Sequence, residues 1–117
     1  MKAISATLLL LLFAVRPSFA EFYTGNVLVG SMREYEKAVR NDPSRDLRLA
    51  TAFTEFIAGV YDSREMDFCT PERTTLGQIA AVVSKYLNAH PEQWNQAAYL
   101  LVLLALKEAF PCSPSGR

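Results

Sequence analysis

The sequence feature that most constrains the fold is a run of ten residues, 97–106, that contains no charged side chain. A helix that is apolar on every side must be buried on every side. Ten residues are too few to span a bilayer, which takes about 20 residues. Protein must therefore surround this segment, either from the same chain or from a partner. It is either a central core helix or a helix whose far face packs on a partner subunit, and the sequence leaves both readings open.

The N-terminus has the pattern of a cleaved secretory signal peptide. Lys2 precedes an apolar run at residues 3–15, and Ser18 and Ala20 supply the small residues that precede a cleavage site. We expect cleavage after Ala20, which removes residues 1–20 and leaves residues 21–117 as one mature domain. The apolar run is too short for a membrane span, so we expect none in the mature form.

The composition of the mature chain argues against nucleic acid as a partner. Residues 21–117 carry 10 Lys and Arg against 12 Asp and Glu, a net charge of −2. Nucleic-acid-binding domains carry a basic patch or stripe instead. With a single histidine and two cysteines far apart in sequence, we also expect no metal site and no cofactor.

The two cysteines of this exported chain predict one disulfide. Cys69 and Cys112 are the only cysteines, and an even count in an oxidising compartment favours pairing. The bond would close a long loop, and the chain-entropy model assigns it about 4 kcal/mol of stabilisation.

Helical periodicity predicts an all-α fold, a small four-helix bundle-like domain. Thr75 and Gln78 have the spacing of a capping box, and Gly59 inside the second helix suggests the close approach of another helix. Residues 62–74 lack a helical period and form the longest predicted loop. The predicted helices run from about residue 26 to 40, 44 to 61, 75 to 87, and from residue 91 or 92 to just before Pro111.

Catalytic chemistry is poorly supplied. His90 is the only histidine and stands beside Pro91 in a turn between helices, where a structural role is ordinary. Neither a glycine-rich phosphate loop nor a nucleophile elbow is present in the sequence. We therefore expect a binding protein rather than an enzyme.

Four stretches of the mature chain resemble the Rap/Tai family of type VI secretion immunity proteins, in order and spacing over nearly its whole length. Many members carry a second cysteine pair, and the nearest positions here are Met32 and Phe53, an apolar pair. The four stretches are residues 22–28, residues 56–60, residues 68–71 with 75–78 and 82–87, and residues 90–92 with 105–112.

The resemblance implies a function. Such proteins reside in the periplasm, form helical bundles that are often homodimers, and inhibit peptidoglycan amidase effectors by inserting a segment into the active-site cleft. An alternative is a periplasmic acid-stress chaperone, which is also small, helical and closed by one disulfide. Suppression of client aggregation at low pH would distinguish the chaperone.

We expect the inhibitory segment in the loop that precedes Cys69, because a blocking segment must project and keep one shape before binding. The alternatives are a merely solvated connection or the shorter turns at residues 41–44 and 88–92. For a homodimer we expect Leu101 and Leu104 at the interface. The expected partner-binding residues are Asp62, Ser63, Arg64, Glu65, Met66, Asp67 and Phe68.

Overall fold

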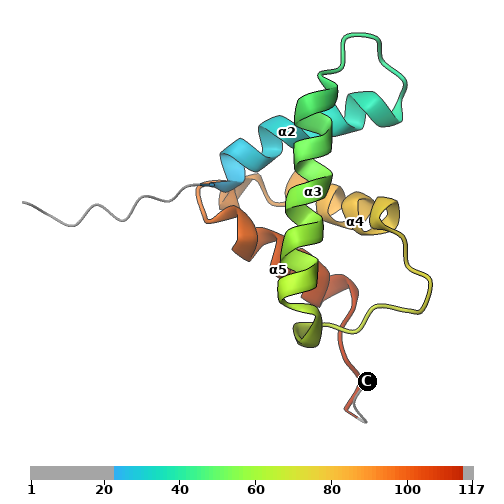
Figure 1. Ribbon diagram of the computed structural model, residues 1–117. Coiled ribbons are helices and arrows are strands. Elements are labelled where there is room, and N and C mark those ends of the chain that lie inside the picture. Colours follow the sequence, from blue (N-terminus) through green and yellow to red (C-terminus); the bar gives the residue numbers. More distant parts are fainter. Residues whose placement is uncertain (1–22, 115–117) are drawn as a thin grey trace, which may run out of the picture.

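The computed structural model describes residues 23–114, and the expected signal peptide lies outside this range. The described residues form four α-helices and two single-turn 3-10 helices, with no strand among them, which confirms the all-α prediction (Figure 1). No helix in the described range is long and apolar enough to cross a membrane. The elements are α2 (Gly25–Val39), α3 (Leu47–Ser63), η1 (Glu65–Asp67), α4 (Leu76–Ala89), η2 (Pro91–Gln93) and α5 (Ala98–Ala109).

Side-chain caps explain where three of the helices begin. Thr24 caps α2 by accepting a hydrogen bond from the backbone N–H of Val27, and Asp46 caps α3 in the same way. Thr75 and Gln78 form the predicted capping box at the start of α4. Each of these side chains satisfies backbone donors that a helix N-terminus otherwise leaves unpaired.

α3 is the helix around which the others are arranged. It contacts α2, α4 and α5, and in Figure 1 it runs from top to bottom across all three. Its buried side chains include Phe53 and Ile57, neither of which has any exposed surface. Met32 on α2 is equally buried, so Met32 and Phe53 both belong to the core.

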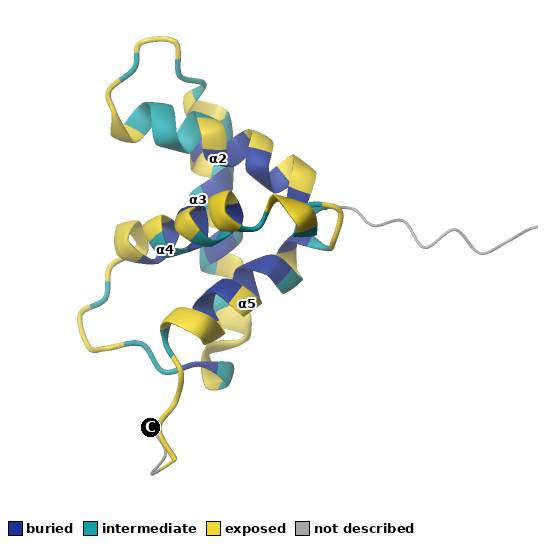
Figure 2. Ribbon diagram, turned by 180° about the vertical axis from the view of Figure 1, so that it is seen from behind, coloured by how far each residue is buried: buried dark blue, intermediate teal, exposed yellow. Residues whose placement is uncertain are grey.

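The uncharged segment forms a core helix, α5, and a partner subunit on the part of this helix that stays exposed remains a prediction. Half of its 12 residues are buried. Figure 2 shows α5 largely in the colour of buried residues. Among its large apolar side chains, only those of Tyr99 and Leu104 are exposed. The buried residues of α5 are Ala98, Leu101, Val102, Leu103, Ala105 and Leu106.

The predicted start of the fourth helix is wrong. Pro91–Gln93 form the 3-10 turn η2, and α5 begins only at Ala98. No side chain caps this helix. Instead, the N–H of Ala98 donates to the carbonyl of Tyr23 at 2.9 Å, and the N–H of Gly25 donates to the carbonyl of Gln96 at 2.7 Å. A backbone bridge to the first described residues therefore fixes the start of α5.

The expectation for Gly59 is also wrong, and a different glycine makes a close approach. Gly59 is exposed and has no neighbouring atom within 4 Å of the position that a Cβ would occupy. At Gly25 such a Cβ would lie 2.5 Å from Leu101 Cδ1 and 2.6 Å from the carbonyl oxygen of Trp94. Gly25 is therefore the position where the start of α2 meets α5 and the chain that leads into it.

Candidate functional site

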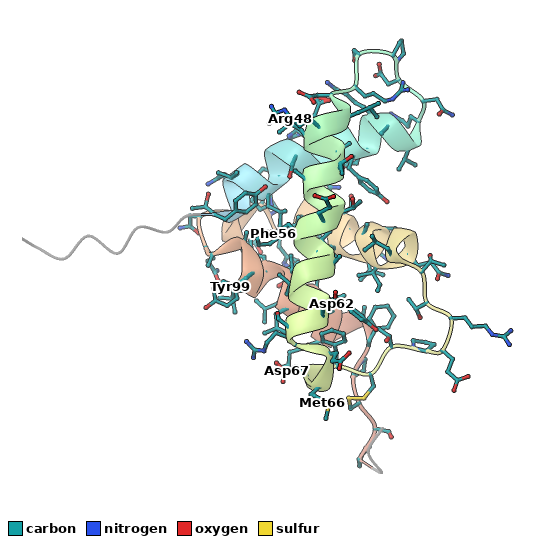
Figure 3. All side chains as sticks on the ribbon, in the orientation of Figure 1. Arg48, Phe56, Asp62, Met66, Asp67 and Tyr99 are labelled. Atoms are coloured by element: carbon teal, nitrogen blue, oxygen red, sulfur yellow. A yellow bond between two sulfur atoms is a disulfide. The ribbon has the colours of Figure 1, made fainter. Side chains whose placement is uncertain are left out.

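A short projection follows α3 at one end of the molecule, and we call residues 64–67 the stapled turn. Arg64 ends α3, and Glu65–Asp67 form the single-turn helix η1. Met66 is 71% exposed, the highest value among the large apolar residues of the described range. Figure 3 shows Met66 beyond the lower end of α3, close to the disulfide bond. An apolar side chain held out in this way is suited to entering a partner's pocket.

Two residues expected in the loop belong to the preceding helix. Asp62 and Ser63 form the last turn of α3, and the Ser63 hydroxyl donates to the carbonyl of Val60 at 3.0 Å. Both residues are exposed. The helix continues past the last apolar residue because polar side chains on a solvent face do not end it. The projecting segment is therefore shorter than expected.

The structure places Phe68 in the core, and this corrects the expectation that it contacts a partner. Phe68 is 1% exposed, and its ring lies 5.1 Å from the ring of Tyr61. Burial of a phenylalanine side chain contributes about 1.5–3 kcal/mol to folding. Phe68 is thus the internal anchor of the stapled turn and leaves Met66 as its exposed apolar group.

The predicted disulfide is confirmed, and it holds the C-terminal side of the turn. Cys69 and Cys112 are bonded, with 4.9 Å between their Cα atoms. The backbone N–H of Cys69 also donates to the carbonyl of Phe110 at 2.8 Å. The next residue, Thr70, has its hydroxyl 2.6 Å from the hydroxyl of Tyr61 on α3. These contacts tie the chain after the turn to both α3 and the end of α5.

Two hydrogen bonds close the turn internally. Arg64 Nε donates to Asp67 Oδ2 at 2.6 Å, and the backbone N–H of Asp67 donates to the carbonyl of Arg64 at 2.9 Å. Both residues are among those that the sequence predicts to bind a partner. In the structure they are oriented toward each other across the base of the turn.

A second tight turn follows the disulfide, and sequence reasoning did not single it out. The N–H and the hydroxyl of Thr74 both donate to the carbonyl of Pro71, at 3.3 and 2.6 Å. Arg73 has a φ of 65°, in the left-handed region that few residues other than glycine and asparagine adopt. The available sequence signal was a proline in a segment without helical periodicity. Glu72 and Arg73 are exposed at its tip.

In the first alternative turn, at residues 41–44, the exposed large apolar side chains flank the turn and do not lie within it. In the turn at residues 41–44, Ser44 donates to Asp42 from both its N–H and its hydroxyl at 2.8 Å, which lowers the pKa of Asp42. Val39 and Leu47 flank this turn and are 64% and 58% exposed.

The turn at residues 88–92 contains no buried residue. Trp94, just beyond it, donates from Nε1 to the carbonyl of Leu87 at 2.8 Å, and His90 Nδ1 lies 3.1 Å from Glu92 Oε1. The ring of His90 also lies 4.2 Å from that of Tyr86. These contacts give His90 a structural environment at the end of α4. Within residues 23–114 no three metal-ligating side chains are grouped together.

The two residues expected at a dimer interface occupy different environments. Leu101 has no exposed surface and packs beside Gly25 inside the monomer, so it is not available to a partner in this fold. Leu104 is 36% exposed and Tyr99, on the same helix, is 54% exposed. Figure 3 shows Tyr99 on α5 at the edge of the molecule. Of the large apolar residues of α5, Leu104 and Tyr99 are therefore exposed to a partner and Leu101 is not.

Comparison with known proteins supports the resemblance noted from the sequence. The family model of the Rap1a immunity proteins matches residues 24–112, which comprise the four helices, both cysteines and the stapled turn. Neither the curated proteins nor the solved structures gave a match. Since the family model covers well over half of the sequence, this chain belongs to the Rap1a immunity protein family.

Proposed function

We propose that this protein is a periplasmic immunity protein that inhibits a type VI secretion peptidoglycan amidase by occluding its active site. Membership of the Rap1a immunity family supports a protective role against an effector. The disulfide supports an oxidising compartment. We propose that residues 1–20 are a signal peptide that directs the mature domain, residues 21–117, to the periplasm, and that the protein itself performs no catalysis.

The observation that carries the mechanism is the stapled turn. Its ends are fixed by α3 on one side and by Phe68 and the disulfide on the other. Because the turn is already ordered, little conformational entropy would be lost when it enters a cleft. Met66 supplies the apolar group for the pocket, and Asp62 and Glu65 are exposed nearby to meet polar groups at the rim.

The test replaces residues 64–67 with a Gly/Ser linker of equal length and keeps Phe68 in place. Retained helical circular dichroism establishes that the fold survives. Affinity for purified peptidoglycan amidase effectors is then measured by calorimetry, and protection of cells is measured against delivery of the same effectors. We expect binding and protection to be lost.

A matched control makes the same replacement at residues 41–44, in the turn at the other end of α3. We expect this variant to bind and protect as the wild type does. If the control loses binding and the stapled-turn variant keeps it, the inhibitory surface is the turn flanked by Val39 and Leu47 instead. If both variants bind as the wild type does, neither of these two turns is the inhibitory segment, and the proposed role of the stapled turn is wrong.

We further propose a homodimer that uses the exposed residues of α5. Tyr99 and Leu104 are the large apolar side chains that are exposed on a helix of which half the residues are buried. Isolated exposed apolar residues are common, so the proposal needs a direct measurement of mass in solution. Light scattering at micromolar concentration provides it, and a monomer mass would contradict the proposal.

A further inference from the structure

The stapled turn contains an ion pair whose position suggests a specific role. Arg64 Nε and Asp67 Oδ2 lie 2.6 Å apart, with 47% and 33% of their side chains exposed. The pair spans the two ends of η1, and Met66 lies between its members in the chain. A surface ion pair of this kind contributes little to global stability. Its local effect is to hold three residues in one shape.

Each member of the pair is itself held by the rest of the fold. The N–H of Arg64 caps the end of α3 by donating to the carbonyls of Val60 and Tyr61. Asp67 is followed directly by Phe68, which is buried in the core. The pair therefore connects two fixed points across the base of the turn, so its geometry determines where Met66 is presented.

We infer that Arg64 and Asp67 are a positioning pair that holds Met66 in its binding orientation, and that their charges do not contact the partner. The inference rests on the proposed function, because it assigns roles within the same inhibitory turn. In this assignment Met66 contacts the partner, and Arg64 and Asp67 affect binding only by positioning Met66. In the absence of the pair, the turn would have to be ordered on binding, which lowers affinity.

The inference is first tested on the free protein. Backbone amide relaxation of Glu65 and Met66 is compared between the wild type, Arg64→Gln, Asp67→Asn and the double variant. We expect all three variants to be more mobile than the wild type on the nanosecond timescale at these two amides, with an unchanged urea midpoint. Equal mobility in all four proteins would overturn a positioning role.

The second measurement is a double-mutant cycle on binding. The probe is the peptidoglycan amidase that the wild-type protein binds most tightly among a panel of purified effectors. Each single variant is expected to bind about tenfold more weakly, equivalent to about 1.4 kcal/mol. The double variant should bind no more weakly than either single variant, because both substitutions remove the same interaction.

Lys37→Gln is the matched control, since Lys37 and Glu34 form an ion pair of the same spacing on α2. It should leave affinity unchanged. Losses that add in the double variant would show that Arg64 and Asp67 each contact the partner, which overturns the inference and leaves the proposed function standing. If the wild-type protein binds none of the amidases, the proposed function fails and the inference fails with it.

Discussion

At the residue scale, Gly25 and Gly59 show that glycine can be required at one position of a small domain and can lower its stability at another. Gly25 occupies a site with no space for a Cβ, because Leu101 and the backbone of Trp94 lie against it. Gly59 lies on the open surface of α3 with no neighbour within 4 Å of a Cβ position. A glycine in a helix interior loses more backbone entropy on folding than alanine does.

We predict that Gly59→Ala stabilises the protein by about 0.5–1 kcal/mol and that Gly25→Ala destabilises it by about 1–3 kcal/mol. The gain arises from the smaller entropy of the unfolded chain, and the loss arises from the forced displacement of Leu101 or of the Trp94 backbone. Urea unfolding of both variants against the wild type measures the two differences. A Gly59→Ala variant less stable than the wild type would contradict the surface position of this residue.

Leu101 and Leu104 permit a similar comparison of buried and exposed positions. Leu101→Asp places an unpaired charge in the core and should cost about 3–5 kcal/mol, visible as loss of helical circular dichroism or a lower unfolding temperature. Leu104→Asp should keep the fold, because Leu104 is 36% exposed. If the protein is a homodimer through α5, light scattering should show that this second variant is monomeric. A folded, stable Leu101→Asp variant would be incompatible with the structure.

At the element scale, local signals fixed the starts of some helices and tertiary contacts fixed others. Thr75 and Gln78 form the capping box that their spacing predicted, because the interaction involves only neighbours in sequence. The start of α5 could not be predicted in this way. Its first N–H is satisfied by the carbonyl of Tyr23, more than 70 positions earlier in the chain. A helix that begins on a backbone bridge needs no capping side chain and so leaves no local signal.

The connection between α2 and α3 has a pH-dependent component. Glu34 Oε1 accepts a hydrogen bond from Lys37 Nζ at 2.9 Å, and Glu34 Oε2 accepts one from the N–H of Asp46, the capping residue of α3, at 3.0 Å. These bonds, that from Lys37 foremost, lower the pKa of Glu34 below its ordinary value of 4.5. A lowered pKa in the folded state means that the ionised form stabilises the fold.

We predict that this contribution is present above pH 4.5 and is lost as the pH falls through the lower pKa of the folded state. Glu34→Gln removes the titrating group, so the variant should be less stable than the wild type near neutral pH. The difference should shrink toward acid, where the wild-type carboxylate becomes protonated. Urea unfolding of both proteins between neutral and acidic pH measures it. A difference that grows toward acid would have the wrong sign.

At the scale of the whole molecule, the sequence indicated where the chain projects but not which side chains are exposed there, and the binding role of this segment stays a prediction. The all-α fold, the disulfide and the location of a projection before Cys69 were all accessible from periodicity and cysteine count. The sequence did not show which side chains of this projection are buried and which are exposed, because Phe68 lies in a segment without periodicity. Nothing in the local sequence shows that the Phe68 ring is turned inward while the Met66 side chain is turned outward. Only the packed core, with Tyr61 against Phe68, determines this.

The disulfide that holds the stapled turn also constrains a large part of the molecule. It closes the chain between Cys69 and Cys112 at a sequence separation of 43. The enclosed segment contains α4 and α5 entirely. Closure of such a loop restricts the unfolded chain and stabilises the fold by about 4 kcal/mol in the chain-entropy model. Small domains have a total stability of about 5–15 kcal/mol, so the bond contributes a large share.

We predict that the double replacement Cys69→Ala with Cys112→Ala lowers the free energy of unfolding by about 2–5 kcal/mol. Urea unfolding of the oxidised wild type, the reduced wild type and the variant gives the values. The reduced wild type and the variant should agree, because both lack the same covalent constraint. Below the unfolding transition the variant should keep its helices, because Phe68 and the hydrogen bond from Cys69 to Phe110 do not depend on sulfur. If the variant is as stable as the oxidised wild type, the bond does not contribute to the stability of the fold, and the packing of α5 alone closes this end of the molecule.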